Sequence, residues 1–344
     1  MHHEVIERII EQGVKAPSGD NSQPWSFSIA DSEVRIFAHP EQDHRVLNIE
    51  GRGTYLSVGA VIENIVIAAE YEGYAAHVQL FQGSATAVII FSHKERSGHH
   101  LYLAIGNRHT HRGPYLSAHE ELLFLRTIEA QPHCHIAIVE EASKIRMVAG
   151  AASVMEETAL RSKTLHSLFF DSIIWSHEQN DGGKSGLYIK TTELPLPIQL
   201  LFRLIRYWPI MRILNAVGFA KVAATSNASV YANSSACVAI ILDGTEPSDY
   251  IGAGRVMQRV WLEVTHAGLV AQPLAGLLYV AEYVSKNTEH DIPEELVQKA
   301  LSAREAIGSA FNVQGETVAM MLRIGSPAKP ATARAARRSP HLLS

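Results

Sequence analysis

APSGDNSQPW, residues 16–25, joins a helical pattern to a strand pattern near the N-terminus. Before it, the apolar residues of 4–14 recur on one side of a helix. After it, residues 25–29 and 34–38 alternate like two strands joined by a turn. Pro, Ser, Gly, Asp and Asn are common turn residues, so composition alone favours an ordinary turn. The alternative is that Ser18, Asn21 and the Gly19 backbone bind the polar edge of a flat ligand.

Length and composition limit the classes of protein to consider. The chain has 344 residues, 47% of them hydrophobic, which suits two domains or one large one. The net charge is −5 and there is no long basic run, so we expect no nucleic-acid partner. Cys134 and Cys237 lie in apolar strand-like runs and are expected to be buried thiols in a reducing compartment. The N-terminal residues do not resemble a signal peptide, so we expect a cytoplasmic protein.

Two long helical patterns have matching glycines. One contains Gly59 and ends near Gly73, and the other contains Gly254 and ends near Gly268. A strand-like run follows each, which suggests two halves of related design. The alternative is that these glycines only allow close helix packing. The patterns predict helices over 54–71, 101–107, 120–130, 145–167, 255–266 and 294–307, and strands over 86–92, 135–139, 237–242 and 318–324.

Three further segments could bind a ligand. Arg108 and Arg112, with Thr110 between them, could hold a phosphate, because a guanidinium donates two parallel hydrogen bonds to phosphate oxygens. Backbone N–H groups of residues 272–276 could approach a cofactor closely. The C-terminal tail offers further arginines. Each segment also has a simpler interpretation: a solvated basic turn, an ordinary turn and a disordered end, respectively.

Residues 194–222 are apolar, aromatic and basic, and prolines and arginines interrupt them. A spanning helix needs about 20 mostly apolar residues, so no membrane span is expected here. We consider a lid over a binding site, a docking surface for a protein or membrane, and a pair of core helices broken at Pro209. The 18 histidines show no convincing metal-ligand spacing, so we assign no metal site.

Taken together, these motifs resemble those of the nitroreductase superfamily, whose members bind FMN. The matching features are APS-x-x-N-x-QPW after a helix, R-x-[ST]-x-R, P-x-x-G after a long helix, and a basic C-terminal tail. The resemblance implies an α+β nitroreductase-like fold with mostly antiparallel sheets flanked by helices. No motif between residue 140 and about 230 matches the family.

The order of the motifs departs from the family pattern, in which R-x-S-x-R precedes APS-x-x-N. Here RHTHR (108–112) follows the loop, and no second APS-x-x-N follows RHTHR. The chain therefore resembles the Acg-like homologues, in which two halves form an intramolecular pseudo-dimer. We expect a first half over 1–100 and a second half over 101–344, with a lid-like or docking insertion at about 180–230. Further dimerisation is left open.

The resemblance implies one complete FMN site built from both halves. Its expected cofactor-binding residues are Pro17, Ser18, Asn21 and Gln23 from the first half, and Arg108, Thr110, Arg112, Pro273, Leu274, Ala275, Gly276, Arg334, Arg337 and Arg338 from the second. No catalytic side chain is assigned.

The implied function is an FMN oxidoreductase that transfers hydride through flavin N5. Its donor would be NADH or NADPH, and its acceptor a nitro compound, a quinone or another small organic molecule. The alternatives are an FMN-storage protein without turnover and a flavin dehydrogenase that tailors a biosynthetic intermediate.

Overall fold

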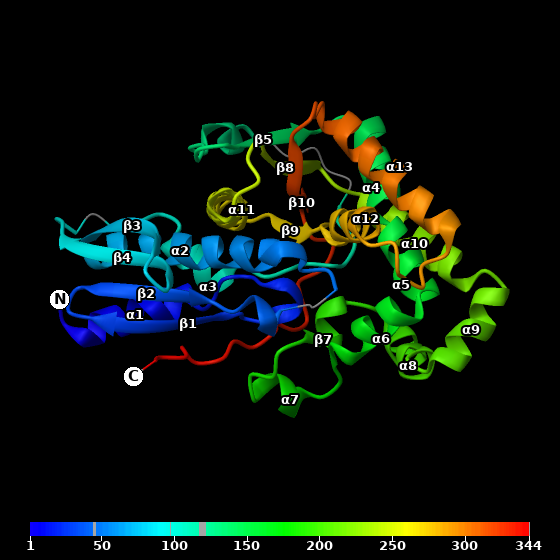
Figure 1. The fold of residues 1–344 in the computed structure, drawn as a ribbon, viewed down its shortest axis with the longest axis horizontal. Coiled ribbons are helices and arrows are strands. Elements are labelled where there is room, and N and C mark those ends of the chain that lie inside the picture. The colour runs from blue at the N-terminus through cyan, green and yellow to red at the C-terminus, as the bar shows by residue number, and fades with distance from the viewer. Residues whose placement is uncertain (44–45, 97, 117–121, 344) are drawn as a thin grey trace.

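The computed structural model describes residues 1–43, 46–96, 98–116 and 122–343. Within these ranges the chain has an α+β fold with two four-stranded antiparallel sheets, and a parallel two-stranded pair elsewhere. Figure 1 shows the sheet of the first hundred residues at one end and a group of short helices at the other. The α+β architecture in two sheet-bearing halves, expected from the sequence, is confirmed.

The first sheet has the strand order β1-β2-β4-β3, and every neighbouring pair is antiparallel. Asp31, in left-handed conformation (φ 51°), makes the turn between β1 and β2, and Gly73 (φ 87°) ends α2. Helices α1 and α2 pack together, and α2 lies against β2 and β3. The elements are α1 (His3–Gly13), β1 (Trp25–Ala30), β2 (Glu33–Ala38), α2 (Arg52–Glu72), β3 (Tyr74–Gln82) and β4 (Ala85–His93).

The second sheet has the order β5-β8-β10-β9 and is covered on both faces. Alternate residues of β8 belong to two different cores: Val238 packs with α11, whereas Ala239 packs with α4 and α13. This explains why all seven residues of β8 are buried. The elements are β5 (Cys134–Val139), α4 (Ala142–Ala152), β8 (Ala236–Leu242), α11 (Pro247–His266), β9 (Val270–Pro273), α12 (Gly276–Lys286), α13 (Glu294–Phe311) and β10 (Thr317–Gly325).

Helices α2 and α11 cross at the two matched glycines. A Cβ added to Gly59 would lie 2.1 Å from the Ile251 carbonyl oxygen, and one added to Gly254 would lie 2.0 Å from the Leu56 carbonyl oxygen. Beside the crossing, the Gln258 amide donates to Asn64 at 2.7 Å in a buried hydrogen bond. The repeated glycines therefore allow the two halves to approach backbone to backbone.

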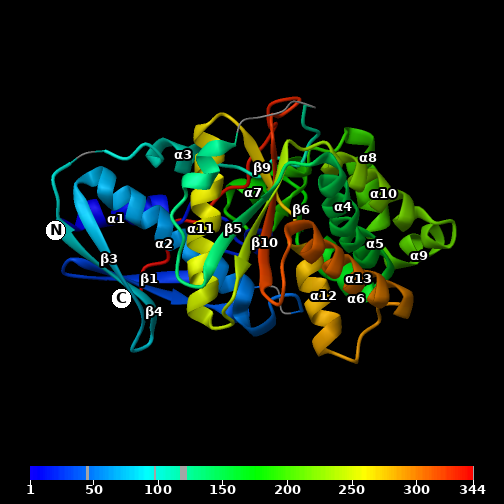
Figure 2. The ribbon, with the colours of Figure 1, turned by 90° about the horizontal axis from the view of Figure 1, so that it is seen from above.

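A smaller group of helices lies at the far end from the first sheet (Figure 2). It has its own apolar core, which includes Phe170, Ile205 and Met211. Its helices are α5 (Val154–Arg161), α6 (Lys163–Asp171), α8 (Leu196–Ile205) and α9 (Trp208–Ala216), with α10 (Phe219–Ala232) packed alongside. The short strands β6 (Ile173–Ile174) and β7 (Leu187–Tyr188) add residues to this core, and α7 (His177–Asp181) lies between them in the sequence, nearer the middle of the molecule.

Several element predictions were wrong in extent. In place of a helix over 120–130, a short 3-10 helix spans Leu123–Thr127, and residues 120 and 121 lie outside the described ranges. The helix expected over 145–167 is three helices, interrupted at Ser153 and Ser162, where the Ser162 hydroxyl accepts from the Leu165 N–H at 3.1 Å. Pro209 lies in the first turn of α9, where proline is tolerated, so it begins a helix. The strand β3 and the helix α12 were not predicted.

The C-terminal tail runs back along the first half of the molecule (Figure 1). The Phe27 N–H donates to the His341 carbonyl oxygen at 2.8 Å, and the Leu343 N–H donates to Phe27 at 2.7 Å. The tail thus pairs with the outer edge of β1. The interpretation of this segment as a disordered end was wrong, because the β1 edge supplies it with backbone partners.

Candidate functional site

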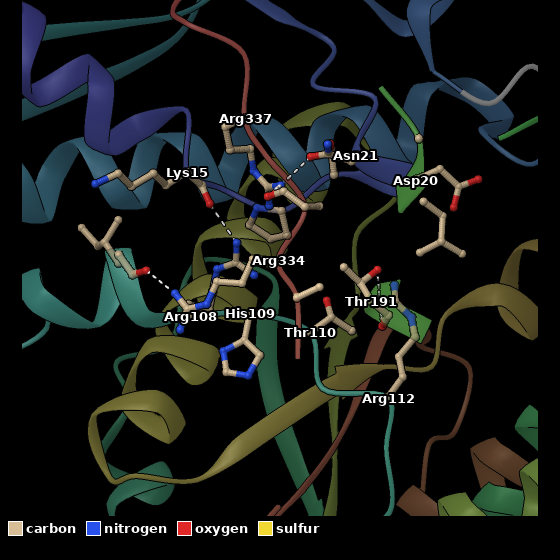
Figure 3. A pocket seen from close by; sticks show the side chains of 18 residues that line it. Lys15, Asp20, Asn21, Arg108, His109, Thr110, Arg112, Thr191, Arg334 and Arg337 are labelled. Carbon is tan, nitrogen blue, oxygen red and sulfur yellow. Dashed lines mark hydrogen bonds between the residues drawn. The ribbon is translucent and has the colours of Figure 1, made fainter. Parts of the chain in front are cut away.

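A cavity of about 310 Å³ lies where segments distant in the sequence meet (Figure 3). The loop after α1 and the short helix α3 (Tyr102–Asn107) with RHTHR supply much of its lining, and the tail and residues 186–191 supply the rest. Of the expected site residues, the cavity brings together Pro17, Ser18, Asn21, Arg108, Thr110, Arg112, Arg334 and Arg337. Lys15, Asp20 and His109, which were not singled out from the sequence, also line it.

The loop after α1 is compact and strained. Asp20, Asn21 and Gln23 have positive φ angles of 43°, 56° and 52°. Non-glycine residues seldom adopt this conformation, and clusters of such strain are typical of binding sites. The Ser18 hydroxyl accepts from the Gln23 N–H at 2.9 Å, which folds the loop back on itself. The sequence APSGDNSQPW therefore forms a tight loop at the wall of the cavity.

The C-terminal tail forms hydrogen bonds with polar side chains of this loop. The Asn21 amide donates to the Ala336 carbonyl oxygen at 3.0 Å, and its Oδ1 accepts from Arg337 Nη1 at 2.5 Å. The Arg338 N–H donates to Gln23 Oε1 at 2.9 Å. Asn21 and Gln23 thus position the tail, and neither Gln23 nor Arg338 lines the cavity.

Arg108 is the most confined cation of the site. It is buried, its Nη2 donates to the Lys15 carbonyl oxygen at 2.8 Å, and its guanidinium lies 4.5 Å from the centre of the Trp261 ring. Among the described residues, its Nε has no hydrogen-bond partner. Burial, followed by the nearby charges of Arg337 and Arg334, lowers the pKa of Arg108 well below its ordinary value.

The two tail arginines stand beside Arg108 at the same side of the cavity (Figure 3). Arg334 Nη1 donates to the Gly106 carbonyl oxygen at 2.8 Å, and Arg337 Nε donates to the Ala16 carbonyl oxygen at 3.2 Å. Burial lowers the pKa of Arg337 to about 10. Among the described residues, no carboxylate forms a salt bridge with any of the three. Three guanidiniums packed without an acid create a strongly positive site, which an anion would stabilise.

Arg112 lies on the other side of the cavity, with Asp20 and Thr191 (Figure 3). Its Nη1 donates to the Thr191 carbonyl oxygen at 3.1 Å. Burial lowers the pKa of Arg112, and the charge of Asp20 partly offsets this. The backbone of Thr110 bridges to Ala271 at the edge of β9. RHTHR therefore directs Arg108 and Arg112 toward different parts of the cavity.

Residues 186–191 cover this second part. They lie within the lid-like or docking insertion expected at about 180–230, although no motif marked these particular residues. Gly186 has φ 140°, and a Cβ there would lie 2.3 Å from the Ser172 carbonyl oxygen. Beside it, the Ser185 hydroxyl donates to the Ser22 carbonyl oxygen at 3.3 Å, so the cover touches the loop. A lid had been considered over 194–222, but none of those residues lines the cavity.

Residues 273–276 lie outside the cavity lining. The Leu274 N–H donates to the Met321 carbonyl oxygen at 2.9 Å, and a Cβ on Gly276 would lie 2.7 Å from Met155 Cγ. Side chains of α5 therefore stand against this segment. Its expected contact with a cofactor stays a prediction, and the geometry gives it no support.

Comparison with known proteins agrees with the motifs. No family model matches the chain. A protein of Mycobacterium tuberculosis H37Rv named "Putative NAD(P)H nitroreductase acg" is 27% identical over 177 residues, which cover 48% of this chain and 53% of the relative. "Putative NAD(P)H nitroreductase Rv3131" of the same strain is 30% identical over 78 residues, 23% of each protein. These partial matches are to proteins named as NAD(P)H nitroreductases, the family whose motifs the sequence resembles.

The chain spans about half the length, or less, of these curated relatives. An uncharacterized M. tuberculosis protein, MT1398, is 21% identical over 80% of this chain and 39% of its own length. Among solved structures, NfnB from Mycobacterium smegmatis is 13% identical, with a TM-score of 0.37 over 70% of this chain and 94% of its own. A nitroreductase from Desulfitobacterium hafniense is 9% identical, with a TM-score of 0.35 over 71% and 94%.

Proposed function

We propose that the chain is an FMN-binding oxidoreductase that accepts electrons from NADH or NADPH and passes them to a small organic acceptor. The supporting observation is the group formed by Arg108, Arg334 and Arg337 beside the APSGDNSQPW loop. The relatives named as NAD(P)H nitroreductases support the same class of reaction. The proposed acceptor is a nitro compound, a quinone or another small organic molecule.

The residues of the cavity fit a phosphate-bearing cofactor. Arg108 Nε is buried and has no partner in the described part of the chain, and a phosphate oxygen would accept a hydrogen bond from it. Burial is the main cause of the lowered pKa of Arg108, and a phosphate would offset the repulsion from Arg337 and Arg334 that adds to it. Arginine suits this task because its planar fork matches phosphate geometry. Arg108, Arg334 and Arg337 would hold the phosphate, and Pro17, Ser18, Thr110 and Arg112 would line the remainder of the site.

Bound FMN would supply the hydride-transfer chemistry, as cofactors do in such enzymes. The chain contributes orientation and exclusion of water. Arg112 is fixed by the Thr191 carbonyl, and the segment 186–191 closes this part of the cavity. The first half supplies the loop, and the second half supplies the arginines. The boundary between the two halves at about residue 100 is part of the proposal.

The proposal is tested by binding. The purified chain, titrated with FMN, should bind it and show a flavin spectrum in the visible range. Arg108→Ala removes a charged hydrogen-bond donor worth about 1.5–3 kcal/mol, so the Kd should rise roughly 10- to 100-fold. Arg126→Ala is the matched control, because Arg126 is exposed and pairs with Glu140 away from the cavity. No FMN uptake, or equal Kd values for the two variants, would contradict the proposal.

Sequestration of FMN without turnover is the second candidate. The cavity of about 310 Å³ is at the low end of the roughly 300–1,000 Å³ typical of ligand pockets, which leaves little room for a second substrate. Anaerobic mixing of the FMN-loaded chain with NADH and with NADPH separates the candidates. Bleaching of the flavin absorbance supports the oxidoreductase, and an unchanged spectrum with both donors supports sequestration.

A further inference from the structure

Helices α8 and α9 expose an unusual number of large apolar side chains. Leu196 is 67% exposed, Ile213 69% and Val217 80%. Both views place these helices at the end of the molecule opposite the first sheet (Figures 1 and 2). We define the basic apolar face as the solvent-facing residues Leu196, Leu200, Arg203, Leu204, Arg212 and Ile213.

The two helices bury a different face. Ile205 of α8 and Met211 of α9 are fully enclosed in the small core with Phe170. On α8, Leu196, Leu200 and Leu204 recur every four residues on the side away from that core. The inner face therefore accounts for the packing of these helices. The exposed leucines are not part of that core, and large apolar side chains gathered on the exposed sides of neighbouring helices are typical of interaction surfaces.

The charged residues of the segment 194–222 all have one sign. Residues 194–222 contain Arg203, Arg206, Arg212 and Lys221 and no acidic residue, although the chain has a net charge of −5. In the described ranges none of these four cations forms a salt bridge. Arg203 and Arg206 instead lie 6.0 and 5.7 Å from the centre of the Trp175 ring. The complementary partner therefore carries negative charge and accepts apolar side chains.

We propose that the basic apolar face binds the surface of a membrane that contains anionic phospholipids. Amphipathic helices with aliphatic tips and flanking arginines lie in the interface plane, with the apolar side chains among the acyl chains and the cations at the headgroups. Trp175, Trp208 and Tyr207 lie in the same region, and aromatic rings of this kind favour the headgroup level. In the described ranges no helix is long and apolar enough to cross a membrane, so the contact is peripheral.

A second copy of the chain fits this face less well. A symmetric dimer places the same patch on both sides, so the arginines of one patch would face a patch that is also basic and has no acidic residue of segment 194–222 to pair with them. Such like-charge contact opposes association, whereas an anionic headgroup layer attracts each arginine by about 1 kcal/mol, or roughly fivefold in affinity.

Co-sedimentation of the full-length chain with lipid vesicles tests the proposal. We expect binding to vesicles of phosphatidylcholine mixed with phosphatidylglycerol, much weaker binding to pure phosphatidylcholine, and loss of binding at high salt. Binding should also shift the tryptophan emission to shorter wavelength, because Trp175 and Trp208 lie beside the face. Equal binding to both vesicle types, or no binding to either, would overturn the proposal.

Paired variants separate the two contributions. Arg203→Gln with Arg212→Gln should weaken binding roughly 25-fold, whereas the exposed pair Arg126→Gln with Arg304→Gln should leave it unchanged. Leu200→Gln with Ile213→Gln should weaken binding about tenfold or more, with Leu103→Gln and Leu123→Gln as equally exposed controls. Melting temperatures confirm that each variant is folded. Undiminished binding by the apolar variant, or a dimer in solution that this variant abolishes, would refute membrane docking.

Discussion

Glu156 on α5 shows how one buried residue couples stability to pH. The Tyr231 hydroxyl donates to its Oε1 at 2.5 Å, and the Asn227 amide lies close enough to lower its pKa slightly. Burial raises the pKa of Glu156 to about 7, and the hydrogen bond from Tyr231 offsets only part of this effect. In the unfolded chain the same carboxyl loses its proton near pH 4.5. Between these values the folded state binds the proton and the unfolded state does not, so stability falls as pH rises from about 4.5 to 7.

We therefore expect Glu156→Gln to stabilise the protein above pH 7. A neutral amide avoids the buried charge, so the free energy of unfolding should rise by up to about 3 kcal/mol at pH 8 and change little at pH 4.5. Thermal unfolding of parent and variant across this pH range measures the difference. The exposed Glu305→Gln is the control and should show no such dependence. A variant less stable than the parent at pH 8 would mean that Glu156 is stabilised as a carboxylate.

At the level of single residues, the sequence predicted which residues lie together at the site. It did not predict the contacts that each of them makes. Arg108 and Arg112 were expected to clamp one phosphate, yet they line different parts of the cavity. The spacing of four residues suggests a shared direction only if the segment is helical, and here α3 ends at Asn107. Asn21 and Gln23 bind the tail, a contact between residues more than 300 positions apart that no local pattern reveals.

At the level of helices and strands, the crossing of α2 and α11 was the feature that the sequence indicated most clearly. Matched glycines at 59 and 254 predicted either a repeat or close packing, and the structure shows both: each half has its own sheet and long helix, and the glycines meet at the crossing. Element boundaries were less predictable where a single serine interrupts a helical pattern, as at Ser153 and Ser162. A lid-like or docking insertion was expected at about 180–230, but the short segment 186–191 lacks any periodicity, so only the tertiary structure shows that these residues cover the cavity.

We expect Gly59→Ala to destabilise the molecule strongly. The new Cβ would lie 2.1 Å from the Ile251 carbonyl oxygen and 2.9 Å from the Arg255 nitrogen, so α2 and α11 must separate. Overpacking of this kind costs about 1–3 kcal/mol, and backbone atoms cannot move aside as side chains do. Gly150→Ala is the matched control, since no atom lies within 4 Å of a Cβ there and alanine favours a helix. Chemical denaturation measures both, and equal stability of the two variants would contradict the account.

At the scale of the whole molecule, the two halves have similar architectures but carry different motifs. APSGDNSQPW occurs once, in the first half, and RHTHR occurs once, in the second. The tail connects them, because it pairs with β1 and brings Arg334 and Arg337 to the cavity. The helices of 194–222 lie at the opposite end from the first sheet, so a surface contact there leaves the first half free.

This asymmetry predicts that each chain binds a single FMN. The sequence contains one group of arginines that would hold the phosphate and one loop that would face them. We therefore expect no second site of equal affinity. Titration of a known concentration of chain with FMN, followed by the quenching of flavin fluorescence, should reach its end point at one equivalent. Arg108→Ala combined with Arg337→Ala should abolish that end point, because the phosphate then keeps only Arg334. The prediction fails if each chain binds two equivalents of FMN and the double substitution abolishes only one of them. That result would show a second FMN site outside the motifs.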